Sequence, residues 1–537
     1  MKRKNVIFPV LLCTLTSLAA TSCKSKVEVG GESTIQIKAY KGGYGTEWLH
    51  AAAEEFQKTN PDIKFDFVEE SSGVTDAAGQ EIMVPKNNQI DLYFLTGIDM
   101  YDCIERSQNI LRTKDKTILE PLDDILDSKA IDKDGKEESE TIGSRIFDGY
   151  IESSSYNGNI AKWQDSVFKL PWADATTGLF CNPSVLAKYG LEKPLTTNEL
   201  VNCVTTIASH TATDKVYPYS WAGQNAPGYW SYLFETWFAQ YSGKKAFDNF
   251  MKCDPGDGDI KRNGYKVYKD QGILKGLEAM YEILDLKYSS NGSASKSHME
   301  AQNEFITGKS AFMVDGDWLL CEMSRDYLDQ AKDIEMVRTP ILSSIGTELG
   351  ITDAQLHTLV EMIDERKNND EIGAVLTMLT SAQIERVRAA RSVHDGIGVG
   401  HDIVIPSYSD AKAAAKKFVR FLYSNDGCRI FRNKAYANMP LSYTPEATDA
   451  NTNFQKSVDQ LYACDKPAMI SGAVKLNNIR SAAQIFIFNY TAWVHPNTYK
   501  SIMIDKNGEN KLSAEYIFTK ESEYVEKSWS KYMTYID

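Results

Sequence analysis

Alternating and helical patterns of apolar residues organise the first hundred residues of the chain. Residues 34–40, TIQIKAY, predict a buried strand, and residues 46–59 predict a helix with Trp48, Ala52 and Phe56 on one face. The segments IKFDFVE and QIDLYFLTG predict two further strands. A strand, a helix and a second strand form a βαβ unit. The loop after its first strand therefore lies where α/β folds place ligands.

Helix and strand signals alternate through the rest of the chain. Thr196 and Glu199 form a capping box for one helix, and Gly190 ends the helix before it. Other periodic segments predict helices at 270–286, 298–308, 409–423 with Ser409 as N-cap, 475–493 and 513–534, and strands at 401–406 and in KSAFMVDGDW. This alternation indicates an α/β fold, and 537 residues with 42% hydrophobic content suffice for two or more domains.

Residues 344–393 have the appearance of an insertion. Two helical segments lie there, each headed by a Thr-x-x-Gln capping box, one from Thr352 to Gln355 and one from Thr380 to Gln383. The pattern is typical of two amphipathic surface helices, and a partner-docking element is the alternative.

The N-terminus has the pattern of an exported protein. The basic start MKRKN precedes an apolar stretch of about 15 residues, too short for a membrane span, and small residues precede Cys23. This arrangement resembles the lipobox of bacterial lipoproteins, in which the cysteine is lipidated, although Ala20 stands where leucine is commoner. A plain cleaved signal with an incidental cysteine is the alternative. We expect a lipoprotein signal peptide at 1–22 and a flexible tether at 23–33.

The body of the protein is acidic. The formal net charge is −14, and losing Lys2, Arg3 and Lys4 with a signal peptide takes it to about −17. Such a charge disfavours nucleic acid and anionic membranes as partners. No later run approaches the roughly 20 apolar residues of a membrane-spanning helix.

The nine cysteines show neither a C-x-x-C pair nor histidines nearby, so no zinc site is expected. Setting aside Cys13 and Cys23 leaves seven. An odd number leaves at least one free thiol unless one of them pairs with another chain. We expect neither a metal nor a cofactor.

Enzyme signatures are missing from the sequence. It contains no G-x-S-x-G, H-E-x-x-H, phosphate-binding loop or dinucleotide fingerprint. Asp/Gly-rich runs such as DPGDGD lack the spacing of an EF-hand and indicate solvated loops, with adventitious calcium as the alternative. Asp315 and Asp317 are close enough in sequence for a carboxylate pair, which alone is weak evidence for glycosidase chemistry.

Aromatic residues gather in predicted loops. Aromatic faces stack on the C–H faces of sugar rings, while nearby Asp, Asn and Gln side chains pair with hydroxyls, so this mixture suits a carbohydrate. Core packing is the alternative for each ring, above all for two of the tryptophans in SWAGQNAPGYW. The aromatic residues concerned are Tyr44, Trp172, Trp221, Tyr229, Trp230 and Trp318.

Four stretches in a fixed order make the chain similar to a known family. They are AYKGGYGTEWLHAAAEEFQKTNPDIKFDFVE, LPWADATTGLFCNPSVLAKYGLEKPLTTNEL, EAQNEFITGKSAFMVDGDWLL and DGIGVGHDIVIPSYSDAKAAAKKFVRFLYSNDG. The chain resembles the extracellular solute-binding proteins of ABC transporters, in the sugar-binding family that includes maltose-binding protein. The resemblance covers most of the chain except 344–393. It implies a periplasmic-binding-protein-like fold, with two α/β lobes and a ligand cleft between them that closes by hinge bending.

The resemblance also implies a domain division. Crossings between the lobes are expected near Pro171, near 312–317 and near 396–402. The first lobe is then expected to comprise 34–170 and 318–400, and the second lobe 171–317 and 401–537, with 344–393 as a helical insert in the first.

Site residues follow from the same resemblance. Trp318, directly after Asp317, matches an aromatic residue that stacks on sugar in relatives, and Tyr44 matches the first-lobe loop. Trp172 and Asp174 lie in the first crossing. Trp221, Tyr229 and Trp230 belong to the aromatic loop of the second lobe. Cys181 departs from the family, which has a tyrosine there, and this departure leaves the ligand open.

The sequence thus predicts a monomeric receptor, lipid-anchored through Cys23 on the extracellular face of the cell membrane. It is expected to capture an oligosaccharide, deliver it to the permease subunits of an ABC transporter, and catalyse nothing. One alternative is a secreted lipoprotein enzyme that acts on glycans through Asp315 and Asp317. Another is a receptor for a peptide or other polar solute. Sugar identity, linkage, chain length and the particular permease stay open.

Overall fold

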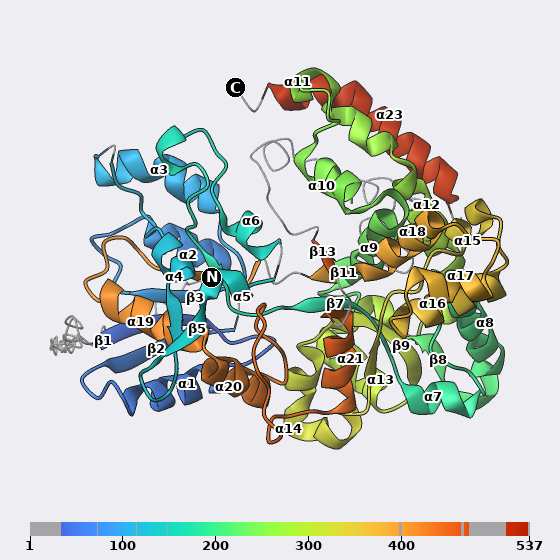
Figure 1. Ribbon diagram of the computed structural model, residues 1–537, viewed down its shortest axis with the longest axis horizontal. Coiled ribbons are helices and arrows are strands. Elements are labelled where there is room, and N and C mark those ends of the chain that lie inside the picture. Colours follow the sequence, from blue (N-terminus) through green and yellow to red (C-terminus); the bar gives the residue numbers. More distant parts are fainter. Residues whose placement is uncertain are drawn as a thin grey trace, which may run out of the picture.

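The computed structural model describes residues 34–71, 74–113, 115–147, 149–396, 400–462, 467–471 and 512–534. The expected signal peptide, tether, lipidated Cys23 and helix at 475–493 lie outside these residues. The described chain forms two α/β lobes, each built on its own sheet, side by side in Figure 1. A two-lobe α/β fold is what the sequence predicts. Within the described residues, every helix is too short or too polar to cross a membrane.

The first lobe is built on a five-stranded sheet in the order β2-β1-β3-β12-β6. Strands β1 (Thr34–Tyr40) and β2 (Lys64–Glu70) are parallel and bracket helix α1 (Glu47–Gln57), as the βαβ pattern predicts. Helix α1 buries the predicted face of Trp48, Ala52 and Phe56. The other strands are β3 (Leu92–Leu95), β12 (Asp402–Val404), antiparallel to β3, and β6 (Leu170–Pro171).

Helices and one hairpin cover this sheet. In chain order they are α2 (Val74–Ile82), α3 (Met100–Leu111), α4 (Asp123–Asp127), the hairpin of β4 (Lys129–Ile131) and β5 (Glu137–Thr141), α5 (Ile142–Arg145), α6 (Tyr150–Ser154), α19 (Lys412–Leu422) and α20 (Asn425–Ala435). Helix α19 starts later than predicted, with Ala411 and not Ser409 as its N-cap. The Ser409 hydroxyl instead donates to Asp91 and accepts the amide of Ala411.

The second lobe is built on a sheet in the order β13-β11-β7-β9-β8. These strands are β13 (Ala468–Ile470), β11 (Val393–Gly396), β7 (Thr176–Cys181), β9 (Ser310–Gly316) and β8 (Tyr217–Tyr219), and β10 (Glu335–Val337) also pairs with β7. The helices are α7 (Pro183–Lys188), α8 (Thr197–Asp214), α9 (Ser231–Ser242), α10 (Lys244–Lys252), α11 (Ile260–Asn263), α12 (Gln271–Ile283), α13 (His298–Ile306), α14 (Leu319–Ala331), α21 (Asn453–Tyr462) and α23 (Ala514–Met533).

The predicted insertion forms part of this second lobe. It contains α15 (Ser343–Leu349), α16 (Asp353–Asp364), α17 (Asn369–Val375) and α18 (Ser381–Ser392), and both predicted capping boxes are present. Leu359 of α16 and Val387 of α18 are fully buried in the same core as Trp237 of α9. The helices therefore contribute one face to the core and expose the other.

Strand pairing divides the chain differently from the predicted domain boundaries. Strands β10 and β11, within 318–400, pair in the second sheet, whereas β12 pairs with β3 and β6 of the first. The assignment of 318–400 to the first lobe and of 402–404 to the second was therefore wrong. Pairing partners lie hundreds of residues apart, so local patterns carry no information about which sheet a strand joins.

Two of the three expected crossings join the sheets. The chain passes from β6 to β7 beside Pro171 and from β11 to β12 across 396–402. At 312–317 the chain does not pass over, because β9 and the following α14 both belong to the second lobe. Another passage follows Leu441 of the first-lobe core and leads to α21 in the second lobe.

The described chain contains free thiols, in agreement with the expectation of at least one. They include Cys103, Cys181, Cys203, Cys321 and Cys428. Cys181, at the position where the family has a tyrosine, is fully buried in the second-lobe core.

Candidate ligand site between the lobes

Tyr44 links the loop after β1 to the second lobe. Gly43 and Gly45 flank it with φ angles of +66° and +63°, a left-handed conformation that glycine adopts without strain. This tight loop directs the Tyr44 hydroxyl to Asp317, whose Oδ1 accepts its hydrogen bond. Both side chains are about 1% exposed. A polar contact between the lobes is thus removed from solvent.

Trp318 stands beside this contact, between the end of β9 and the start of α14. Its ring lies 6.3 Å from that of Tyr44 and 5.9 Å from that of Tyr229, edge to face in both cases. It is 6% exposed. Trp318 therefore lies between an aromatic ring of the first lobe and one of the second.

Asp174, in the segment that joins β6 to β7, also connects the two lobes. Its Oδ1 accepts hydrogen bonds of 2.5 Å from Tyr150 of α6 and from Tyr462 of α21, and its Oδ2 accepts one of 2.7 Å from Thr176. Tyr150 belongs to the first lobe and Tyr462 to the second. Sequence analysis missed both tyrosines, because no local signal marks a residue that meets the site only through the fold.

A second pair of carboxyl groups lies next to Trp318, whose side chain is hydrogen-bonded to Asp315. The amide nitrogen of Gln302 donates to Asp315 at 3.0 Å and to Glu322 at 2.6 Å. The imidazole of His298 lies 3.9 Å from the Glu322 carboxylate. Gln302 thus holds two acidic side chains together at the end of β9 and the start of α14.

Burial disfavours the charged form of all these carboxyl groups. It raises the pKa of Asp174 to about 6 and that of Asp315 to about 7. Burial and then the charge of Asp315 raise the pKa of Glu322 to about 8, and burial followed by the charge of Asp174 raises that of Asp317 well above its usual range. Since the folded pKa values exceed the unfolded ones, these groups favour folding at acidic pH. Their contribution is lost as pH rises through about 6 to 8.

The predicted site residues thus fall into three groups. The first group consists of the residues that the fold brings together, which are Tyr44, Asp174, Tyr229, Asp317 and Trp318. Trp172 alone forms the second group. Trp172 is adjacent but lies in the first-lobe core: its ring stacks on Trp48 at 5.6 Å, and its indole N–H donates to the carbonyl of Leu95 at 3.0 Å.

Trp221 and Trp230 form the third group. Trp221 donates to Ser289 at 3.0 Å, and Trp230 packs edge to face on Tyr219 at 5.2 Å. Both rings lie within the second-lobe core, which favours the core-packing alternative for this pair.

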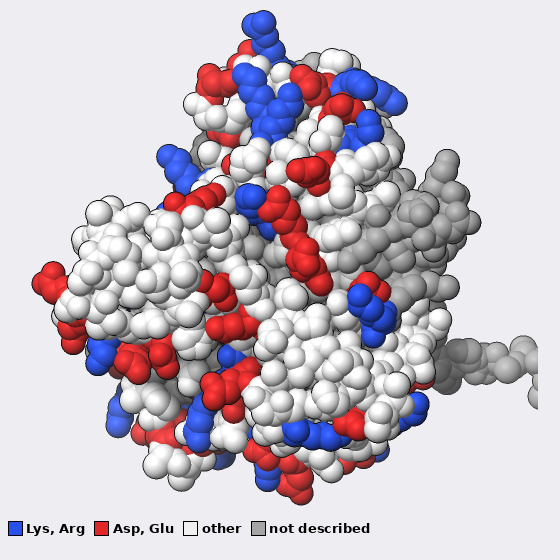
Figure 2. All heavy atoms as spheres, turned by 90° about the vertical axis from the view of Figure 1, so that its right-hand side faces the viewer, with Lys and Arg blue, Asp and Glu red and all other residues white. Residues whose placement is uncertain are grey.

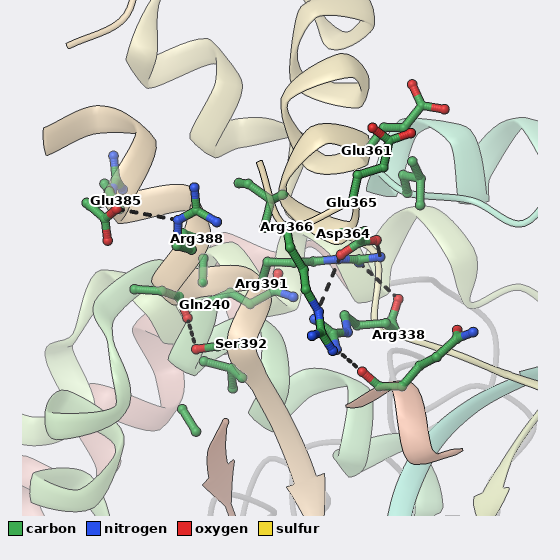
Figure 3. A pocket seen from close by; sticks show the side chains of 18 of the residues that line it. Gln240, Arg338, Glu361, Asp364, Glu365, Arg366, Glu385, Arg388, Arg391 and Ser392 are labelled. Atoms are coloured by element: carbon green, nitrogen blue, oxygen red, sulfur yellow. Dashed lines mark hydrogen bonds and ion pairs between the residues drawn. The ribbon is translucent and has the colours of Figure 1, made fainter. Parts of the chain in front are cut away.

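A large pocket lies elsewhere, on the second lobe. It encloses about 1430 Å³ and is lined by α16, α18 and the end of α9 (Figure 3). Arg391 crosses it, forms a two-point ion pair with Asp364 at 3.0 and 2.7 Å, and donates to the carbonyl groups of Arg338 and Thr339. No predicted site residue lines this pocket, and Arg391 is engaged by protein groups.

Charged side chains of both signs share the outer face of the second lobe (Figure 2). Lys and Arg side chains lie next to Asp and Glu side chains there, so that face offers no extended patch of one sign.

Two α/β lobes joined by several crossing segments, with aromatic and carboxyl side chains where the lobes meet, define a two-lobe solute-binding protein. The chain belongs to the bacterial extracellular solute-binding protein family, whose model matches residues 42–427. A search of curated proteins found no match.

Solved structures of such proteins share the fold. A chitin oligosaccharide binding protein is 15% identical with a TM-score of 0.56, and the match covers 93% of this chain and 99% of that one. The bacterial solute receptor AcbH, described as exclusive for β-D-galactopyranose, is 13% identical with a TM-score of 0.55 over 93% and 100% of the two chains. The maltose-bound MalE3 of T. maritima is 14% identical with a TM-score of 0.55 over 92% and 99%.

Proposed function

We propose that the protein is a lipid-anchored receptor that captures an oligosaccharide between its lobes and delivers it to an ABC transporter permease. One observation carries the proposal: Trp318 lies between Tyr44 and Tyr229 where the lobes meet, beside the carboxyl group of Asp317. Aromatic faces stack on sugar rings and carboxylates accept hydrogen bonds from sugar hydroxyls. Membership of the solute-binding family supports uptake as the role.

Ligand entry requires the lobes to separate. Tyr44, Asp174, Asp317 and Trp318 are each at most 6% exposed. Hinge bending at the crossings would expose them, and closure would then bury a ligand between them. Such opening would break the Tyr44–Asp317 hydrogen bond and the hydrogen bonds that join Asp174 to Tyr150 and Tyr462. Contacts with the ligand would replace them.

The proposal also includes a lipid anchor on the membrane and a permease that receives the ligand. Cys23, after a basic and apolar leader, is the proposed lipidated residue at the extracellular face of the cell membrane. The protein would act as a monomer and hand its ligand to membrane-embedded permease subunits.

A panel of neutral and charged oligosaccharides, tested by calorimetry together with product analysis, tests this function. We expect heat of binding without product, and loss of that heat in Trp318→Ala. Cleavage of a glycan that disappears in both Asp315→Asn and Asp317→Asn would instead establish the glycan enzyme. Binding of peptides but of no saccharide would establish the other rival.

A further inference from the structure

The site between the lobes has three buried carboxyl groups and a fourth, that of Glu322, whose side chain is 14% exposed, and little positive charge to balance them. Asp174 and Asp317 repel each other beside Tyr44, and Asp315 and Glu322 do so beside Tyr229. Among the ion pairs of the described residues, none joins a lysine or arginine to any of the four.

The neighbouring groups do little to offset this charge. His298 is the basic partner of Glu322 in the described chain, and burial lowers its pKa, which disfavours its cationic form. Asp459 also acts on Asp174, but it is acidic and raises the pKa of Asp174 further. Asp459 itself forms an ion pair with Arg432. His401 packs its ring against Tyr44.

Two acceptor atoms of this site lack a hydrogen-bond donor. Asp317 Oδ2 and Gln302 Oε1 are buried, and neither has a hydrogen-bond partner in the described chain. Both residues are at most 1% exposed, and both orphaned atoms are acceptors. A buried acceptor without a donor destabilises the closed site, so a ligand that donates at these two points would be favoured.

Aromatic rings frame these acceptors. Trp318 adjoins both carboxyl pairs, since it follows Asp317 directly in the chain and its side chain is hydrogen-bonded to Asp315. Tyr44 lies next to the first pair and Tyr229 next to the second. Aromatic faces together with carboxylates are the surroundings that proteins use to bind organic ammonium groups. Within the described chain, no three acidic, histidine or cysteine side chains converge to hold a metal ion, so an organic cation fits the site better.

We infer that the solute carries a protonated amine, and that it is an amino sugar oligosaccharide whose ammonium group lies between Trp318 and the carboxyl groups of Asp317 and Glu322. This inference rests on the proposed function and narrows its ligand class. The ammonium would balance the carboxyl groups as they ionise and would also supply the missing donors. A neutral sugar would supply donors only.

The test compares oligosaccharides of glucosamine with those of N-acetylglucosamine of the same length, because they differ in charge and share a sugar skeleton. Calorimetry of the full chain measures the affinity of both forms. We expect the glucosamine forms to bind on the order of 10-fold to 100-fold more tightly, as expected for a hydrogen bond to a charged group. Equal or tighter binding of the acetylated forms would overturn the inference and leave the proposed function standing.

Variants that remove one carboxyl group test which residues cause the preference for glucosamine oligosaccharides. Asp317→Asn and Glu322→Gln should each reduce that preference at least several-fold. Asp326→Asn, on the exposed face of the same helix α14, is the matched control and should retain the full preference. Thermal unfolding of each variant verifies folding, and an unchanged preference in both folded site variants would refute the assignment.

Binding of a polyamine such as spermidine tests whether the site recognises an amine alone or an amino sugar. Binding of spermidine with no saccharide of either kind would overturn both the amino sugar and the proposed function. Weak or absent spermidine binding beside strong glucosamine binding supports the inference.

Discussion

Replacing Trp318 by alanine separates a ligand-binding role from a purely structural one. The indole lies between Tyr44 of the first lobe and Tyr229 of the second, and 94% of its surface is buried, since 6% is exposed. Removing it deletes a stacking surface for a sugar ring and also part of the contact between the lobes. The substitution should therefore affect closure on ligand more than folding of either lobe.

The size of the effect follows from the buried area. A tryptophan buries about 150 to 250 Å², worth roughly 4 to 6 kcal/mol at about 25 cal/mol per Å². Because Trp318 has neighbours in both lobes, this total is divided between folding and closure. We expect a loss of about 2 to 4 kcal/mol in binding, or about 30-fold to 1,000-fold in affinity. The loss in unfolding free energy should stay below the roughly 3 to 5 kcal/mol of a tryptophan in a single core.

Ligand calorimetry and thermal unfolding without ligand measure the two parts. Trp529→Ala is the matched control, because Trp529 of α23 is 3% exposed in the second-lobe core and donates to the carbonyl groups of Ile260 and Lys261. That variant should lose stability and bind normally per folded molecule. If Trp318→Ala behaves in the same way, Trp318 is a core residue and the proposed site is refuted.

Three further predictions concern the anchor, the hinge and the buried charges. Cys23→Ser should abolish lipid labelling and release the protein from membranes, and unchanged membrane association would exclude the anchor. Saturating ligand should compact an open form measured by small-angle scattering, so identical curves would count against closure. Asp315→Asn should raise the unfolding temperature more near pH 8 than near pH 5, because the buried carboxyl has its pKa raised to about 7 and destabilises the fold once ionised. Equal shifts at both pH values would contradict this account.

Much of the local structure was predictable because its causes are local. Helix α1 follows from the spacing of Trp48 and Phe56, and the capping boxes at Thr196 and Thr380 mark helix starts through bonds within one turn. The resemblance in four ordered stretches was enough to predict two lobes. Tyr44 and Trp318 could be proposed as site residues because each adjoins a glycine-rich turn at the end of a strand.

Only the tertiary structure decided how these parts combine. Strand β12 joins the first sheet and β11 the second because their partners are chosen by pairing across distant segments, which no local pattern encodes. Tyr462 reaches Asp174 from 288 positions away. Trp172 and Trp318 both pack in the first-lobe core, but Trp318 also contacts Tyr229, which packs against the second-lobe core that holds Trp230. Burial thus depends on which surfaces the folded lobes bring together. The sequence by itself determined the elements and the class of protein, and the packing of the lobes decided which side chains face one another across the site.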